Sequence, residues 1–331
     1  MVSITQTTLL ALLCTSVGVS AVTNPPPGAF IVSKTPKGTT KTFPTVSSAI
    51  QALPADKPAT LFIYPGVYRE QVVINRKAPL TIIGYSRHDA DYKSNQVLIT
   101  YKQPASTVGS NDKSGTLQAH LKDFAVYNVN IRNEWVGSQA IAVSAQDDRQ
   151  AYYGCQLLGY QDTLLTNAGH HFFGKTYIEG RTDYIFGQRS RAYFQKCDMR
   201  SLDKGWVTAS GVDSAQNRGV YVFNQCTVAA AKKAVPTVKG GVFLGRPWRT
   251  FAHVLFMNSN LSDVVNPEGW ARWRPTDPVE NLQFYEYNNK GVGARKQKRA
   301  GFSRRLATKE LSQYTITKVL NGTAWVDKRY M

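Results

Sequence analysis

Cysteine is scarce in this chain of 331 residues, which contains four. Cys14 lies in a short apolar run near the N-terminus, and removal of that run would leave Cys155, Cys197 and Cys226. An odd number cannot form a complete disulfide framework, so at most one bridge is possible. Cys197 and Cys226 occupy the same position in a repeat described below, so a bridge between them is geometrically possible. We nevertheless expect free, buried thiols.

Long apolar runs are also missing, apart from the N-terminal one. None approaches the about 20 residues that a membrane span needs, and no membrane association is expected. The apolar run at residues 8–14 and the small residues at 19–21 predict a signal peptide over residues 1–21, although a positive n-region is absent. The alternative is a buried N-terminal helix.

A secreted product with one mature domain, residues 22–331, follows from that prediction. Asn260 and Asn321 each begin an Asn-x-Ser/Thr sequence and are the candidate glycosylation sites. We find no linker that would divide the mature chain.

Acidic residues are few: 22 stand against 40 basic ones, which gives a formal charge of +18. Nucleic acid is the usual partner of so basic a chain, but a secreted protein is more often exposed to acidic polysaccharides. The alternative is charge that serves only solubility. A basic cluster occupies the C-terminal part, at Arg295, Lys296, Lys298, Arg299, Arg304 and Arg305.

A short repeat fills the middle of the chain. An aromatic residue is followed three positions later by a small residue and two further on by an apolar one. The small residues are Cys155, Thr176, Cys197, Cys226 and Ser259, at steps of 21, 21, 29 and 33 residues. The segments alternate as strands do, and no crossover helix fits between them. Such repeats stack as the coils of a parallel β-helix.

The flanks of the repeat are expected to differ from it. Residues 43–53 predict a short capping helix with Thr45 as its N-cap. Strands are expected at residues 60–64, 71–74 and 80–85. The basic, irregular stretch from about residue 288 is expected to run back along the solenoid.

Two aspartates occupy equivalent positions in successive coils. Asp162 and Asp183 each end a Gly-x-x-Asp sequence, and 183 − 162 = 21 residues, one short coil. Stacked strands lie ~4.8 Å apart, so the two carboxylates should be neighbours. Two carboxyl groups so close together cannot both ionise easily, so one stays protonated as an acid while the other is an anion. The alternative is a pair of aspartates that only cap turns.

Other polar and aromatic residues are expected near the same face. Gln139 precedes the pair by about one coil and offers an amide. Arg246 can hold a carboxylate ionised, and Trp248 can stack on a sugar ring.

Five ordered motifs then make the chain resemble the pectin methylesterase (pectinesterase) family over nearly its whole mature length. The motifs are Gly66-Val67-Tyr68-Arg69-Glu70, Gln139-Ala140-Ile141-Ala142, Gly159-Tyr160-Gln161-Asp162-Thr163-Leu164, Asp183-Tyr184-Ile185-Phe186-Gly187 and Leu244-Gly245-Arg246-Pro247-Trp248. The resemblance implies an all-β fold, a single-stranded right-handed parallel β-helix with a short N-terminal capping helix. It also implies the compact secreted microbial or fungal type, which acts on plant cell walls.

The resemblance implies demethylation of methyl-esterified homogalacturonan to pectate and methanol, by carboxylates alone. Asp183 matches the nucleophile. Asp162 matches the general acid and, later, the general base. Arg246 matches the residue that hydrogen-bonds the nucleophile and keeps it anionic. Pectin is the expected partner of what we expect to be a monomer, and no metal, cofactor or nucleic acid is implied.

Four further residues take roles from the same resemblance. Gln139 and Gln161 match the amides that stabilise the oxyanion. Trp248 and Phe186 match aromatic walls of the sugar groove, where Gln139 and Arg246 also contact substrate. The chain departs from many relatives at Leu165, where they carry a tyrosine, and at Gln188, where they carry Asn or Asp. These departures concern substrate preference, not the reaction.

Competing functions lack their own motifs. A polygalacturonase-like glycosidase on the same fold would show Asn-Thr-Asp, Gly-His-Gly and Arg-x-Lys, which are absent, and Asp147-Asp148 fits a polar turn. A serine esterase would show Gly-x-Ser-x-Gly, and a pectate lyase an acidic cluster. His170 and His171 point to opposite faces of a strand and cannot share a metal. A non-catalytic wall-binding solenoid stays as the second alternative.

Overall fold

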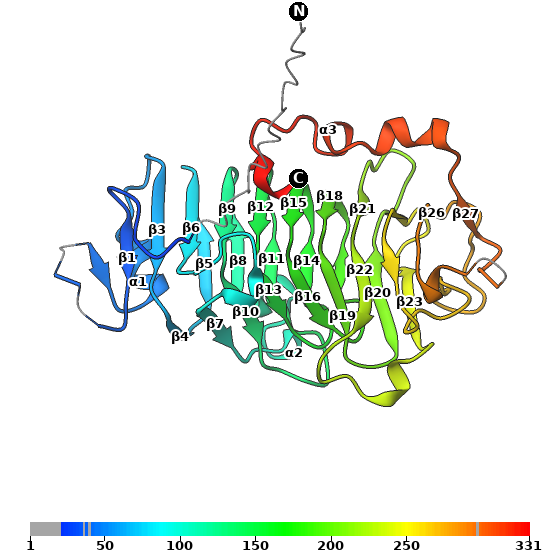
Figure 1. The fold of residues 1–331 in the computed structure, drawn as a ribbon, viewed down its shortest axis with the longest axis horizontal. Helices are drawn as coiled ribbons and strands as arrows, with labels where there is room; N and C mark the ends of the chain where they lie inside the picture. The colour runs from blue at the N-terminus through cyan, green and yellow to red at the C-terminus, as the bar shows by residue number, and fades with distance from the viewer. Residues whose placement is uncertain (1–20, 36, 39–40, 296–297) are drawn as a thin grey trace, which may run out of the picture.

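Three parallel sheets wind around one core and give an elongated solenoid (Figure 1). The computed structural model describes residues 21–35, 37–38, 41–295 and 298–331. The expected signal peptide, residues 1–21, lies outside this part except for its last residue. No helix in the described part of the chain has the length and apolar character needed to cross a membrane.

The largest sheet has twelve strands, and each strand from β3 to β26 opens one coil. In spatial order these are β2 (Thr42–Phe43), β1 (Phe30–Val32), β3 (Ala59–Ile63), β6 (Leu80–Gly84), β9 (Phe124–Tyr127), β12 (Gln150–Tyr153), β15 (Ala168–Gly174), β18 (Arg189–Gln195), β21 (Val220–Asn224), β24 (His253–Met257), β26 (Gln283–Tyr287) and β27 (Ser303–Arg305).

The other two sheets take the second and third strands of each coil. The eight-stranded sheet holds β25 (Asn260–Leu261), β22 (Thr227–Ala230), β19 (Asp198–Ser201), β16 (Tyr177–Gly180), β13 (Gln156–Leu158), β10 (Asn130–Asn133), β7 (Val97–Tyr101) and β4 (Gly66–Arg69). The seven-stranded sheet holds β23 (Val242–Pro247), β20 (Gly205–Ser210), β17 (Ile185–Gly187), β14 (Leu164–Thr166), β11 (Val143–Ala145), β8 (Leu117–His120) and β5 (Val72–Asn75). The predicted parallel β-helix is confirmed. The strands expected at residues 60–64 and 71–74 are shifted by one residue, and the one expected at 80–85 ends one residue earlier.

Inside the coils, the predicted repeat aligns residue on residue. Its aromatic positions form a ladder in which Tyr152, Phe173, Phe194, Phe223 and Phe256 pair in register. Successive rings stack with centroids 5.0, 4.6, 4.4 and 4.2 Å apart. The small residues that follow are also buried, and the three cysteines among them are free. The longer steps of 29 and 33 residues carry longer loops beside β20 and β23, as expected.

A short helix closes the N-terminal end of the solenoid. Helix α1 (Val46–Gln51) begins after Thr45, whose hydroxyl accepts from the Ser48 amide and completes a capping box. The amides of Val46 and Ser47 donate to the Glu70 carboxylate at 2.9 and 2.8 Å. The carboxylate thus satisfies helix N–H groups that have no partner within the helix, and the predicted cap is confirmed.

The C-terminal segment runs back along the large sheet, as predicted (Figure 1). It carries α3 (Ile316–Val319), and its apolar residues, among them Leu320 and Tyr330, pack on the outer face of that sheet. The Tyr330 hydroxyl donates to the Asp89 carbonyl at 2.5 Å. Short elements complete the chain: α2 (Ala105–Val108), η1 (Tyr92–Ser94), η2 (Asp112–Ser114), η3 (Pro236–Val238), η4 (Val292–Ala294), η5 (Thr308–Tyr314) and η6 (Lys328–Tyr330).

Candidate active site

Asp162 and Asp183 lie in the same turn of neighbouring coils. Gln161 pairs with Thr182 in parallel register, and the Asp162 amide donates to the Thr182 carbonyl at 3.0 Å. Both aspartates adopt left-handed backbone conformations, with φ of 63° and 49°, a region that Asp enters more readily than most residues. The register predicted from the 21-residue spacing therefore brings the two carboxyl groups side by side.

Close packing explains why each Gly-x-x-Asp sequence begins with glycine. A Cβ on Gly159 would lie 2.6 Å from the Thr163 hydroxyl, and one on Gly180 would lie 2.3 Å from the Tyr184 Cβ. Thr163 and Tyr184 follow the aspartates directly and are fully buried. The glycines let these neighbours turn into the core, which leaves each aspartate on the outer side of the coil.

Arg246 forms a two-point ion pair with the carboxylate of Asp183. Nε donates to Oδ1 at 3.0 Å and Nη2 donates to Oδ2 at 2.7 Å. The side chains of Asp183 and Arg246 are only 6% and 17% exposed, so water screens the pair little. Such a two-point contact fixes both the orientation and the charge of the carboxylate. Within the described residues, the Asp162 carboxyl has no comparable cationic partner.

The two carboxyl groups differ in their affinity for a proton. Burial raises the pKa of Asp162 well above its usual value, and the charge of Asp183 raises it further. Burial also raises the pKa of Asp183, but the hydrogen bonds and charge of Arg246 oppose that rise. Asp183 therefore ionises first, and the pair holds one proton, on Asp162, over an intermediate pH range.

Gln139 and Gln161 stand next to this pair. They pair with each other in parallel register on adjacent coils, one position before the row that holds Asp162. Gln139 is exposed and Gln161 is half-buried. Neither side-chain amide has a hydrogen-bond partner among the described residues, so both are free to donate to a bound group.

The outer face of the seven-stranded sheet carries a small apolar cluster. Phe186 and Leu165 are neighbours in register and are buried, together with Ile141 and Ala209. Trp248 packs edge-on against Phe186 with ring centroids 6.1 Å apart and keeps part of its surface exposed. Phe186 is only 3% exposed, so it supports the surface more than it forms it, whereas Trp248 is accessible.

Two tryptophans that the sequence reasoning missed hold Arg246 in place. The Arg246 guanidinium lies 3.7 Å from the ring centroid of Trp206 and 4.0 Å from that of Trp273. The guanidinium thus contacts two aromatic rings and donates its hydrogen bonds to Asp183. The one available signal was the gathering of several of the chain's six tryptophans near Arg246 in the sequence.

The His170–His171 pair and the two sequon asparagines make no hydrogen bond or ion pair with Asp162 or Asp183 among the described residues. His171 is buried between Thr166 and the Asp147 carbonyl, and His170 bonds to Asp148 at 2.7 Å. Among the described residues, no group of acidic, histidine and cysteine side chains has a metal-binding arrangement. The sequon residues Asn260 and Asn321 are both exposed.

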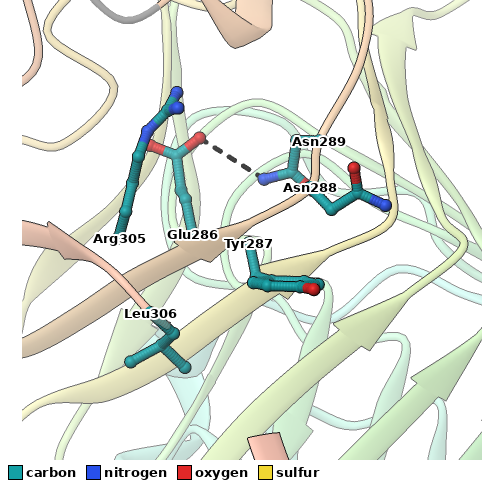
Figure 2. A pocket seen from close by; sticks show the side chains of 6 residues that line it. All are labelled: Glu286, Tyr287, Asn288, Asn289, Arg305 and Leu306. Atoms are coloured by element: carbon teal, nitrogen blue, oxygen red, sulfur yellow. Dashed lines mark hydrogen bonds between the residues drawn. The ribbon is translucent and has the colours of Figure 1, made fainter. Parts of the chain in front are cut away.

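The C-terminal basic cluster lies at the far end of the solenoid. Arg299 is neutralised by Glu286, with hydrogen bonds of 2.7 and 3.1 Å, and Arg304 is paired with Glu310. Lys296 lies outside the described residues. A cavity of about 350 Å³ opens there, between β26 and β27 (Figure 2). The one carboxylate that lines this cavity, Glu286, is paired with Arg299, so the cavity offers no free group for catalysis.

The fold and the site together define a parallel β-helix protein that carries two neighbouring carboxyl groups, one of them paired with an arginine, on its outer surface. The pectinesterase family model matches residues 30–323. The chain is 37% identical to the probable pectinesterase A of Aspergillus fumigatus over 322 residues, or 95% of this chain and 96% of that protein. The crystal structure of Aspergillus niger pectin methylesterase superposes with a TM-score of 0.86, at 34% identity, over 94% of this chain and all of that one. The chain belongs to the pectinesterase family.

A further solved structure shows a family member with a ligand. A pectin methylesterase in complex with a hexasaccharide has a TM-score of 0.73 at 26% identity, over 88% of this chain and 96% of that one. The activity of the present chain is that of a carboxylic ester hydrolase which demethylates homogalacturonan. The polygalacturonase-like alternative is thereby set aside.

Proposed function

We propose that Asp183 is the nucleophile of this esterase. In this role its carboxylate attacks the carbonyl carbon of a galacturonate methyl ester and forms a tetrahedral intermediate. The proposal rests on one observation above all, the two-point ion pair with Arg246, which orients one carboxylate oxygen and favours its anionic form. Because Arg246 itself packs against two indoles, the nucleophile would be positioned before the substrate arrives.

Asp162 acts as the acid and then as the base in the proposed mechanism. As the intermediate collapses, Asp162 gives its proton to the departing methoxide and methanol leaves, with an anhydride left between Asp183 and the sugar. Asp162 then takes a proton from water, whose oxygen attacks the anhydride and releases Asp183. The new acid group of the sugar loses its proton to solvent. The raised pKa of Asp162 supports the acid role.

Gln139 and Gln161 stabilise the oxyanion of both tetrahedral intermediates. The proposal is supported by their unpaired amides and by their place in the row next to Asp162. Donors already placed where negative charge develops lower the barrier without reorganising. Trp248 supplies an exposed aromatic surface for a sugar ring, with Phe186 behind it.

Methanol release from highly methylated pectin tests these roles. Asp183→Ala should abolish turnover while pectin binding survives, and Asp162→Asn should slow it strongly. Gln139→Ala should lower kcat by roughly 10²–10³ with little change in KM. Asp56→Ala is the matched control, because Asp56 is exposed and is distant in the sequence from Asp162 and Asp183.

The outcomes separate the alternatives. Substantial turnover by Asp183→Ala would require another nucleophile, and a change confined to KM would make Gln139 a ground-state binding residue. Wild-type protein that binds pectin but releases no methanol would favour the non-catalytic wall-binding solenoid.

We further propose that the protein is secreted, with residues 1–21 removed, and that it acts as a monomer on plant cell-wall pectin. The small residues at 19–21 and the exposed sequons at Asn260 and Asn321 support secretion and glycosylation. Mass spectrometry of the exported protein would test the new N-terminus and both asparagines, and light scattering would test the oligomeric state.

A further inference from the structure

A second polar cavity lies between the large sheet and the C-terminal segment. It measures about 570 Å³ and opens at the first residues of β21 and β24, beneath η5 and α3. Its lining comprises Arg191, Ala215, Asn217, Arg218, Val220, His253, Gln283, Ser312, Gln313, Tyr314 and Lys318. None of these is acidic, and within the described part of the chain no ion pair involves Arg191, Arg218 or Lys318.

Arg191 makes this cavity unusual. Its guanidinium donates to three carbonyl oxygens, those of Val319, Arg218 and Lys318, at 2.8, 2.8 and 3.1 Å. Burial lowers the pKa of Arg191, and the charge of Arg218 lowers it further. A partly buried cation that is held by neutral carbonyls and repelled by a second cation lacks charge compensation.

Neighbouring titratable groups do not supply that compensation, and Glu310, whose charge acts on the lining residue Tyr314, is already paired with Arg304. Burial lowers the pKa of His253 to about 3, so this lining residue is neutral at ordinary pH. The Asp213 carboxylate bonds to Asn217 at 2.9 Å but does not line the cavity, and the charges of Arg189 and Arg249 also act on it. The cavity thus keeps an excess of positive charge.

We propose that this cavity binds the carboxylate of a demethylated galacturonate unit and so holds the enzyme on its own product strand. The proposal rests on the activity of the family, because each turnover creates one such anion on the polymer. Arg218 and Lys318 are exposed, with side chains free to reach a ligand. Gln283 and Gln313 have unpaired amides that can meet sugar hydroxyls.

The cavity is distinct from the candidate active site, and one loop runs from the first to the second. The loop at residues 211–219 begins beside Trp248, since a Cβ on Gly211 would lie 2.7 Å from the indole. The same loop ends at Arg218 and Gly219, by the cavity mouth. A single polygalacturonate strand could therefore be held by the cavity while another of its units is demethylated.

Calorimetric titration with trigalacturonate at low salt tests the proposal. The double variant Arg218→Gln/Lys318→Gln should bind about tenfold more weakly than wild type, because two charge-assisted contacts are lost. The matched control is Lys232→Gln/Lys233→Gln, which removes the same charge from an exposed loop after β22. It should retain wild-type affinity. Each single variant should be intermediate, and thermal unfolding midpoints confirm that all variants fold.

Three results would overturn the proposal. Equal affinity of the double variant and its control would mean that net charge alone attracts the ligand. Equal binding of trigalacturonate and its trimethyl ester would exclude carboxylate recognition. Displacement of trigalacturonate by an equal concentration of sulfate would identify a general anion site. A lack of methanol release is a separate result, which bears on the proposed catalytic residues and not on this cavity.

Discussion

The indole of Trp206 lies face-on to the guanidinium of Arg246, at 3.7 Å from ring centroid to guanidinium carbon. Arg246 in turn makes the two-point contact with Asp183. Trp206 therefore influences the candidate nucleophile indirectly, by holding the arginine that holds Asp183. This is a positioning role, and it can be distinguished from simple packing.

Trp206→Leu should lower kcat/KM by about tenfold, since a desolvated cation–π contact contributes about 1–2 kcal/mol. A freer Arg246 holds Asp183 less firmly as an anion, so the acidic limb of the pH profile should move to higher pH. Trp325→Leu, remote from Arg246, is the control. If Trp206→Leu lowers the rate but leaves the pH profile unmoved, Trp206 acts only in packing.

The pH profile of kcat/KM should be bell-shaped. Activity falls on the acidic side as Asp183, whose pKa is raised mainly by burial, takes up a proton. It falls on the alkaline side as Asp162, whose pKa is raised more strongly, loses the proton that it must give to the departing methoxide. Arg246→Gln should shift the acidic limb upward by removing the group that favours the anion. A shift confined to the alkaline limb would reverse the two assignments.

Leu165 is the position to test for substrate preference. It lies beside Phe186 in register, where its 6% exposure leaves a dry apolar surface. Leu165→Tyr adds a hydroxyl that can reach a substrate, so the ratio of kcat/KM for high- and low-methyl pectin should change. Leu165→Met keeps the apolar character and is the control. Unchanged ratios in both variants would remove this position from substrate recognition.

The thiols should be inert in the folded protein. Cys155, Cys197 and Cys226 are buried and free, and burial raises the pKa of Cys155 to about 12. A thiol reagent should therefore titrate the mature protein only after denaturation, with three equivalents. A reducing agent should leave the unfolding midpoint unchanged. A lower midpoint under reduction would reveal a bridge between two of them.

Much of the fold could be predicted because its signals are local and repeated. Thr45 begins the capping helix through its own hydroxyl, and the aromatic and small residues of each coil recur at visible spacings. The ends of the three expected strands were accurate to one residue, whereas helix α1 (Val46–Gln51) is shorter than the expected range 43–53 by three residues at its start and two at its end. The strand at 66–69 was missed because its burial alternates over only four residues, too few for a clear period.

The juxtaposition of Asp162 and Asp183 followed from sequence alone, since one 21-residue coil without an insertion leaves a single register. The contact of Arg246 with Asp183 did not follow from spacing, because 63 residues and two long loops of unequal length separate them, and only the family resemblance led us to expect it. Only the folded chain could bring the tryptophan rings onto Arg246, bury Phe186 and lay the C-terminal segment over Arg191. Local spacing fixes neighbours within stacked coils, whereas contacts across loops depend on how the loops pack, which no spacing records.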